Sequence, residues 1–144
     1  MIRQAQRKES LILAQLVHEC WPHHPLPDCL KEIQDNLEKA GVAYFLAFQG
    51  DTPIGFAQCQ LRYDYVEGTT LSPVGYLEGI YVQKDYRKKK IATALLQACQ
   101  NWAKEKNCRE FASDCEFENE ASLNFHLETG FTKVNQIICF AKTL

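Results

Sequence analysis

The segment VGYLEGIYVQKDYRKKKIATALLQ, residues 74–97, decides the fold that this sequence predicts. It begins as an apolar strand, continues as a polar turn rich in cations, and ends with the apolar spacing of an amphipathic helix. Such a turn presents free backbone N–H groups and positive charge together, a combination that binds anions and phosphate in particular. Glu78 places a carboxylate inside the apolar strand. We therefore expect a phosphate site beside a buried acid.

The rest of the sequence predicts one domain over residues 1–144, of the mixed α/β or α+β class, with helices on both faces of a strongly twisted sheet. The predicted order is βααβββαβαβ. It comprises a strand at 2–4, a helix from 8 to 21, a loop at 21–28, a helix stopped by Gly41, strands at 42–48 and 54–63, the strand and helix of 74–107, a strand at 109–114, a helix at 121–128 and a final strand or bent pair of strands at 131–142.

Composition limits the classes of function. With 46% hydrophobic and 24% charged residues the chain is typical of a globular protein, and no apolar run reaches the ~20 residues of a membrane span. The N-terminus lacks the apolar core of a signal peptide. Seven scattered cysteines without a C-x-x-C motif favour reduced thiols in the cytoplasm, and no metal site is expected. A net charge of −2 argues against general nucleic-acid binding.

The four cations at residues 87–90 lie where the long helix is expected to begin. There they oppose the helix dipole at about 0.3–1 kcal/mol each when exposed. This placement is unfavourable for stability but suits a turn that normally holds a polyphosphate. A solvated basic turn without a ligand is the alternative interpretation.

Two motifs in the C-terminal half resemble signatures of the GCN5-related N-acetyltransferase superfamily. RKKKIA at residues 87–92 is similar to its acyl-CoA pyrophosphate loop, R-x-x-G-x-A, and NEASLNFHLETGF at 119–131 is similar to its N-x-x-A-x-x-L-Y-x-x-x-G-F motif. More narrowly, WPHH (21–24), RYDYVEGTTLSPVGYLEGIYV (62–82) and EFASD (110–114) resemble the aminoglycoside 6'-N-acetyltransferases. The resemblance runs from Trp21 to the C-terminus and implies the fold of that superfamily.

The resemblance implies acetyl-CoA as co-substrate. Strand N–H groups would contact the thioester carbonyl and pantetheine arm, and the basic turn would hold the pyrophosphate. The implied contacts are Ile80, Tyr81, Val82, Arg87, Lys88, Lys89, Lys90, Ile91, Ala92, Thr93 and Asn119.

Two residues depart from the superfamily pattern. Lys90 replaces the usual glycine, which predicts either a looser approach of the backbone to the pyrophosphate or a lysine–phosphate contact. His126 replaces the tyrosine that protonates the departing thiolate in many members. An imidazolium could supply that proton, whereas a packed helix residue without a catalytic role is the alternative.

Acetyl transfer to an amine also requires removal of a proton from an ammonium group. Glu78 alternates with Tyr76, Ile80 and Val82 on one predicted strand face, where an unpaired ionised carboxylate would be costly. A structural ion pair would explain it, but the resemblance favours a general base acting directly or through water.

Acidic and aromatic side chains are the candidates for the acceptor site. Asp114 ends the fifth strand, and Glu116, Glu118 and Glu120 follow it, so this edge would attract a cation or simply form a solvated loop. The resemblance places Asp114 in the active site. It also implies a sugar pocket built from two loops, with cation–π contacts to an amine; its residues are Trp21, His24, Tyr65 and Glu67.

These residues together predict direct acetyl transfer from acetyl-CoA to the 6'-amine of aminoglycosides in a ternary complex, which would confer antibiotic resistance. The alternatives are acetylation of another small polyamine or a protein amine, a non-catalytic acyl-CoA-binding regulator, and an RNA-binding module using residues 87–90. The resemblance also implies a homodimer through the C-terminal strands, which the apolar residues 134–140 would support.

Overall fold

Five strands form one sheet in the computed structural model, which describes all residues from Met1 to Leu144. The spatial order follows the sequence, and the first four strands pair antiparallel whereas β5 pairs parallel to β4. The parallel pair requires a crossover, which α3 (Ile91–Glu105) provides. The strands are β1 (Ile2–Gln4), β2 (Val42–Gln49), β3 (Thr52–Arg62), β4 (Val74–Val82) and β5 (Phe111–Ser113).

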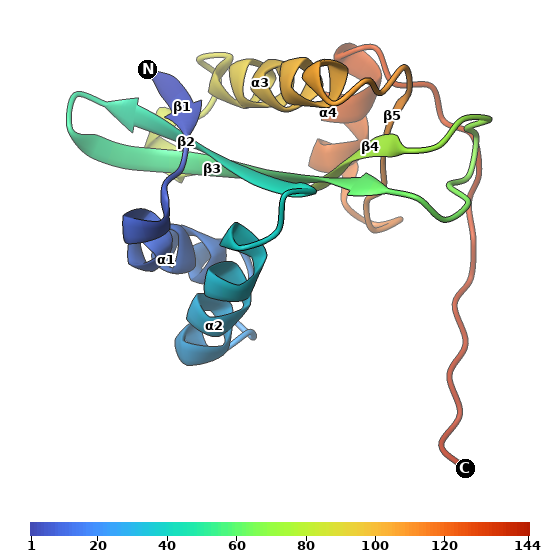
Figure 1. Cartoon of the computed structure of the whole chain (residues 1–144), viewed down its shortest axis with the longest axis horizontal. Helices are drawn as coiled ribbons and strands as arrows, with labels where there is room; N and C mark the ends of the chain where they lie inside the picture. Colours follow the sequence, from blue (N-terminus) through green and yellow to red (C-terminus); the bar gives the residue numbers. More distant parts are fainter.

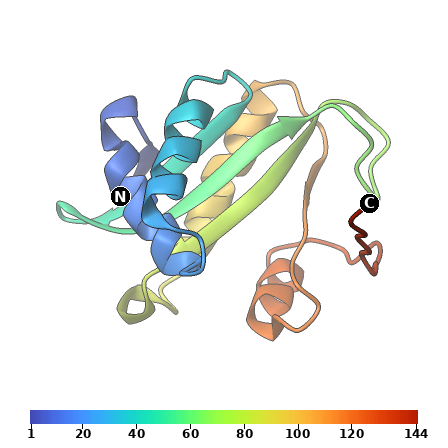
Figure 2. The same cartoon turned by 90° about the horizontal axis from the view of Figure 1, so that it is seen from below.

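Helices cover both faces of the sheet. The pair α1 (Ser10–Cys20) and α2 (Leu26–Leu37) lies on one face and α3 on the other, while α4 (Glu120–Glu128) stands to one side of the sheet (Figures 1 and 2). Short 3-10 turns occupy Arg7–Glu9 and Lys84–Tyr86. None of the helices combines the length and apolar composition that a membrane crossing requires.

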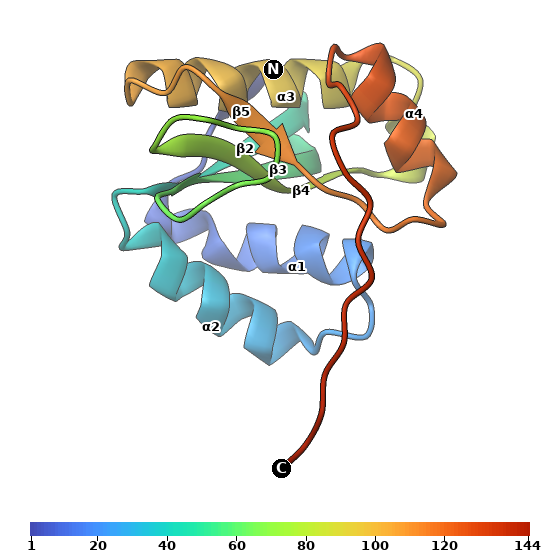
Figure 3. The same ribbon diagram turned by 90° about the vertical axis from the view of Figure 1, so that its right-hand side faces the viewer.

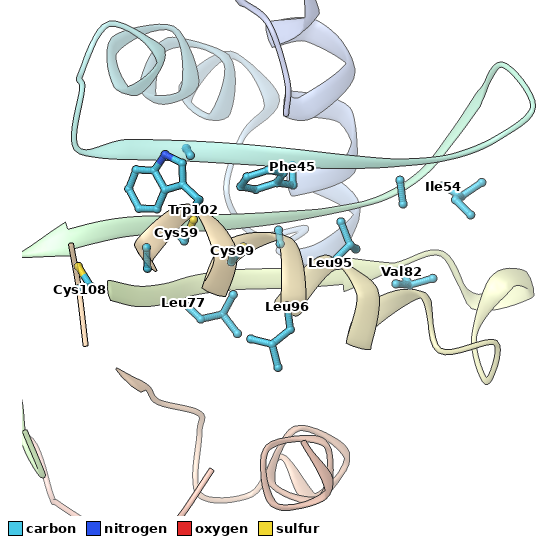
Figure 4. Packing of buried hydrophobic residues seen from close by; sticks show 14 residues of the cluster. Phe45, Ile54, Cys59, Leu77, Val82, Leu95, Leu96, Cys99, Trp102 and Cys108 are labelled. Atoms are coloured by element: carbon cyan, nitrogen blue, oxygen red, sulfur yellow. The ribbon is translucent and has the colours of Figure 1, made fainter. Parts of the chain in front are cut away.

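Two apolar clusters, one on each face, hold these layers together. The larger lies between the sheet and α3, where Leu95, Cys99 and Trp102 pack on β2–β4 (Figure 4). The smaller joins Leu13 and Ile33 of the helix pair to the opposite face. The mixed sheet with helices on both faces confirms the predicted fold class.

The loop predicted at residues 21–28 is too long. The second helix already begins at Leu26, and Pro27 is accommodated because a first-turn N–H has no partner within the helix. That helix also ends at Leu37 rather than at Gly41, with Glu38 as its C-cap.

The predicted strand at 131–142 is wrong. After α4 the chain leaves the body as an extended segment that pairs with no strand (Figure 3). Its side chains at Val134, Ile137, Ile138 and Phe140 are 58–90% exposed. A strand needs a hydrogen-bonding neighbour, which an alternating apolar pattern cannot supply. The observed order is therefore βααβββαβα.

Candidate active site

The basic turn between β4 and α3 has the conformation expected of an anion site. Lys88 (φ 63°) and Lys90 (φ 60°) both adopt the left-handed conformation, which costs a non-glycine residue about 1–2 kcal/mol. Lys90 thus takes a conformation that glycine adopts freely, so the turn does not need glycine to form. Helix α3 begins at Ile91, so the four cations precede the helix instead of forming its first turn.

The start of α3 has unused hydrogen-bond donors. Lys90 is its N-cap and makes no side-chain capping hydrogen bond. The N–H groups of the first turn, which includes Ile91, Ala92 and Thr93, therefore remain available to an anion together with the helix dipole. Lys88 and Lys89 are exposed beside them.

Arg87 is partly engaged within the protein. Its Nε donates to the Val82 carbonyl oxygen at 2.8 Å, and its guanidinium lies 5.7 Å from the Tyr81 ring centroid. These contacts connect the turn to the end of β4 and hold the Arg87 guanidinium there, with its terminal Nη1 and Nη2 groups left as donors. The predicted pyrophosphate contact would be made from this fixed position.

A bulge in β4 separates residues that the sequence places on one face. Gln58 of β3 pairs with Gly79 and Cys59 pairs with Leu77, so Glu78 is the extra residue between the two pairs. Leu77, Ile80 and Val82 all pack in the α3 cluster. The prediction that Glu78 shares a face with Ile80 and Val82 is therefore wrong. A regular alternation continued from Leu77 would have turned Ile80 away from α3.

Glu78 is held by a cation that the sequence-based prediction omits. Arg62, at the end of β3, donates to both carboxylate oxygens of Glu78, at 2.7 and 3.0 Å. The Glu78 side chain is only 17% exposed, and its hydrogen bonds raise the pKa of Arg62. The structural ion pair considered as the alternative role of Glu78 is thus present, and it fixes the carboxylate in one orientation.

The same cation links Glu78 to Asp114. The Arg62 guanidinium lies 3.4 Å from the Tyr76 ring centroid, and the Tyr76 hydroxyl donates to Asp114. Burial, reinforced by the hydrogen bond to Asp114, raises the pKa of Tyr76, which keeps the phenol protonated as a donor. The structure therefore connects the two predicted acids through Arg62 and Tyr76. A cation at the end of an apolar strand is the sequence signal that identifies Arg62.

His126 contacts β5 rather than the acid pair. Its Nε2 lies 2.8 Å from Ser113 Oγ, and its Nδ1 donates to the Ser122 carbonyl oxygen at 2.6 Å. The imidazole also packs near Phe131, with ring centroids 5.0 Å apart. Since Asp114 follows Ser113 directly, His126 contacts the neighbour of Asp114 in the chain.

Trp21 and His24 lie on the face of the sheet that the helix pair covers. The Trp21 indole packs on the backbone of Gly79, where an added Cβ would be 2.5 Å from Trp21 Cη2. His24 Nε2 is 3.1 Å from Glu32 Oε2. Both residues line a cavity of about 230 Å³ between the helix pair and the sheet, together with Val17, Cys29, Glu32, Ile33, Tyr44 and Gln58.

Tyr65 and Glu67 are not brought to this cavity. Both side chains are exposed in the loop between β3 and β4, and Glu67 accepts a hydrogen bond of 2.6 Å from Asn135 of the C-terminal segment. Glu67 instead lines a second cavity of about 270 Å³ formed with β5, Gln100 of α3 and residues 129–134. Within one chain the predicted sugar-binding residues therefore lie in two separate places.

Asn119 is engaged as a helix cap. Its Oδ1 accepts from the Ser122 N–H at 3.1 Å and so caps α4. The Asn119 amide N–H₂ remains as the group that could reach the predicted cofactor. No group of three or more His, Cys, Asp or Glu side chains is arranged to hold a metal ion.

Comparisons with known proteins identify the family. Residues 9–131 match the model of the acetyltransferase (GNAT) family. An aminoglycoside N(6')-acetyltransferase type 1 of Stenotrophomonas maltophilia is 40% identical over 99% of this chain and 93% of its own length, and a protein of the same name from Salmonella typhimurium is 37% identical over 98% and 97%. A solved structure of AAC(6')-Iy in complex with the bisubstrate analog CoA-S-monomethyl-acetylneamine has a TM-score of 0.95 at 35% identity, covering 100% of this chain and 98% of that one. The chain belongs to the acetyltransferase (GNAT) family.

Proposed function

We propose that this protein transfers the acetyl group of acetyl-CoA directly to the 6'-amine of aminoglycoside antibiotics, and that it thereby confers resistance. The observation that carries the proposal is the arrangement around β4. The strand ends in an uncapped, cation-rich turn suited to a pyrophosphate. Its bulge presents Glu78, which Arg62 and Tyr76 connect to Asp114 at the end of β5. The names of the relatives supply the acceptor class.

Acetyl-CoA fits the features of the turn. The first-turn N–H groups of α3 and the exposed side chains of Lys88, Lys89 and Lys90 would hold its pyrophosphate, with Arg87 and Asn119 beside them. Pairing of β5 with β4 stops at Leu77, so the strand edge from Glu78 to Val82 lacks a β5 partner and could receive the pantetheine arm. This edge carries the predicted contacts Ile80, Tyr81 and Val82.

The acids would act on the acceptor. Glu78 would take a proton from the ammonium group, directly or through water, because Arg62 fixes its carboxylate in place. Asp114, oriented by the Tyr76 hydroxyl, would attract a second positive charge of the substrate. Trp21 would offer an aromatic face to the amino sugar. His126 would return a proton to the departing thiolate.

A thiol-release assay over a panel of amines tests the proposal. We expect release of CoA with kanamycin-like acceptors and none with a matched aminoglycoside that carries a hydroxyl at the 6' position. Turnover with spermidine or peptides but not with aminoglycosides would instead establish the polyamine or protein-amine alternative. Binding of acetyl-CoA without turnover on any amine would favour the acyl-CoA-binding regulator.

We further propose that the protein acts as a homodimer through its C-terminal segment, in the cytoplasm. Residues 134–140 leave the body extended, with most of their apolar side chains exposed, and such a segment can pair with a strand of a second copy. The seven free cysteines support a reducing compartment.

Two lysine substitutions in this segment are expected to give a monomer. In Ile137→Lys/Ile138→Lys the charges would have to be buried in the dimer, whereas both positions are exposed in the single chain. Sedimentation velocity measures the change. Lys133→Glu/Lys142→Glu, which alters charge without affecting apolar area, serves as the matched control and should remain dimeric. A monomeric wild type would contradict the proposal.

A further inference from the structure

Ser113 lies at the point where β4 and β5 separate. Its pairing with Leu77 is the last between the two strands, after which β4 continues for five more residues beside β3 alone. The chain after β5 then turns away from β4 toward α4 (Figure 2). Glu78 directly follows Leu77 and Asp114 directly follows Ser113, so the backbone at Ser113 lies next to both predicted acids. Its side chain shares the face of its pair partner Leu77, on the α3 side of the sheet.

The hydrogen bonds of His126 define which ring nitrogen faces this point. A backbone carbonyl only accepts, so the 2.6 Å contact with the Ser122 oxygen requires a hydrogen on Nδ1. In the neutral ring Nε2 is then an acceptor, and Ser113 Oγ at 2.8 Å is its donor. Edge contact with Phe125 and the packing of Phe131 hold the ring in this orientation.

The Ser113 hydroxyl has three acceptors within reach and a single hydrogen. Besides His126 Nε2 it lies 3.3 Å from the Leu77 carbonyl oxygen, at the end of the β4–β5 pairing, and 3.5 Å from the Asp114 carbonyl oxygen. When the imidazole is protonated, Nε2–H donates to Oγ and the hydroxyl hydrogen must turn to another acceptor. The hydroxyl can therefore exchange one hydrogen bond for another without moving its oxygen.

We propose that Ser113 is a catalytic residue that relays a proton from His126 to the thiolate leaving at this point, an inference that rests on the proposed function. The Nε2–H bond of the imidazolium breaks as a new Oγ–H bond forms, and the former Oγ–H bond breaks as S–H forms. CoA leaves as the thiol and His126 is left neutral, to be reprotonated from water. The acceptor ammonium loses two protons as its nitrogen becomes an amide: one goes to Glu78 and the other to water. Since one proton from water restores the imidazolium, a complete turnover releases one proton and the step balances.

Single-turnover measurements of acetyl transfer test the relay. We expect Ser113→Ala to lower the rate at saturating substrates by about 10–100-fold, a share of the usual effect of general acid catalysis, with KM for both substrates changed by less than about twofold. Ser113→Thr keeps the hydroxyl and a good strand former, and should restore most of the rate. Ser122→Ala is the matched control, because it removes a hydroxyl that lies 3.4 Å from Nδ1 but keeps the Ser122 carbonyl oxygen that accepts from Nδ1 at 2.6 Å.

A double-mutant cycle identifies the route. If Ser113 acts through His126, Ser113→Ala should cause no further loss in a His126→Gln background. Equal losses in both backgrounds, or a Ser113→Ala rate like that of the wild type, would overturn the inference.

A measurement independent of activity separates this inference from the proposed function. Nitrogen-15 NMR of wild type and Ser113→Ala should show a shift of the His126 Nε2 resonance, with Nδ1 unchanged. An unchanged Nε2 resonance would show that Ser113 and His126 are not hydrogen-bonded, and the relay would then be refuted. A wild type that acetylates no amine but shows the Nε2 shift would refute the proposed function and the relay chemistry, while leaving the Ser113–His126 contact intact.

Discussion

Glu78→Gln is expected to lower kcat for acetyl transfer by about 10²–10⁴-fold, the usual range for loss of an acid–base group. Glutamine keeps the size of the side chain and still accepts a hydrogen bond from Arg62, but it cannot take a proton from the ammonium group. The affinity for acetyl-CoA should be unchanged, because the proposed pyrophosphate site lies at the other end of the β4–α3 unit. Thiol release measures kcat, and isothermal titration calorimetry measures acetyl-CoA binding.

Glu118→Gln is the matched control. Glu118 is an exposed acid between β5 and α4, so the same chemical change is made outside the Arg62–Tyr76 network and should leave kcat at the wild-type value. If Glu78→Gln retained wild-type turnover, the role of Glu78 would be limited to its ion pair with Arg62. A circular-dichroism melt of each variant checks that the loss of the charged pair has not unfolded the protein.

Gly79→Ala is expected to lower kcat/KM for the acceptor by about 10–100-fold, because small displacements at a site can cost up to ~10²-fold. The new Cβ would lie 2.5 Å from Trp21 Cη2, closer than real contacts allow, so the indole must move off the strand. Gly79 has no positive φ, and alanine is therefore tolerated by the backbone itself. KM for acetyl-CoA should not change, and steady-state kinetics with each substrate varied in turn measures both effects.

The same substitution in a Trp21→Ala background separates the ring from the backbone. With the indole removed the new methyl group meets no obstacle there, so Gly79→Ala should cause little further loss. A loss of equal size in both backgrounds would assign the effect to the β4 backbone at the bulge, and Trp21 would have no part in acceptor binding.

Much of the architecture follows from local patterns. The apolar stretch at 74–82, the cation-rich turn and the spacing of Leu95, Cys99 and Trp102 predict the β4–α3 unit close to its observed limits. Helices α1 and α4 also lie within a few residues of their predicted ends. These elements could be predicted because helix and strand periodicity, turn residues and caps act over a few neighbouring positions.

The sequence predicts which residues belong to the candidate site, but not which residues contact them. Glu78, Asp114 and His126 were identified from the sequence, whereas the partners that orient them, Arg62, Tyr76 and Ser113, lie 13–38 positions away from them in the chain. No short-range pattern reports a hydrogen bond between side chains of different strands. The bulge at Glu78 is equally invisible, because it exists only in the register of β4 against β3.

The sequence by itself determined the βα unit, its cation-rich turn and the presence of an acid within an apolar strand, since each depends on neighbouring residues. Only the tertiary structure decided that the Glu78 side chain lies on the opposite face of β4 from Ile80 and Val82 and that Arg62 is its ion-pair partner. It also decided that residues 131–142 form no strand within one chain. These outcomes depend on hydrogen bonds between distant segments. Strand register decides which face of the sheet each side chain occupies before and after the bulge. An extended segment becomes a strand only when it hydrogen-bonds to a neighbouring strand.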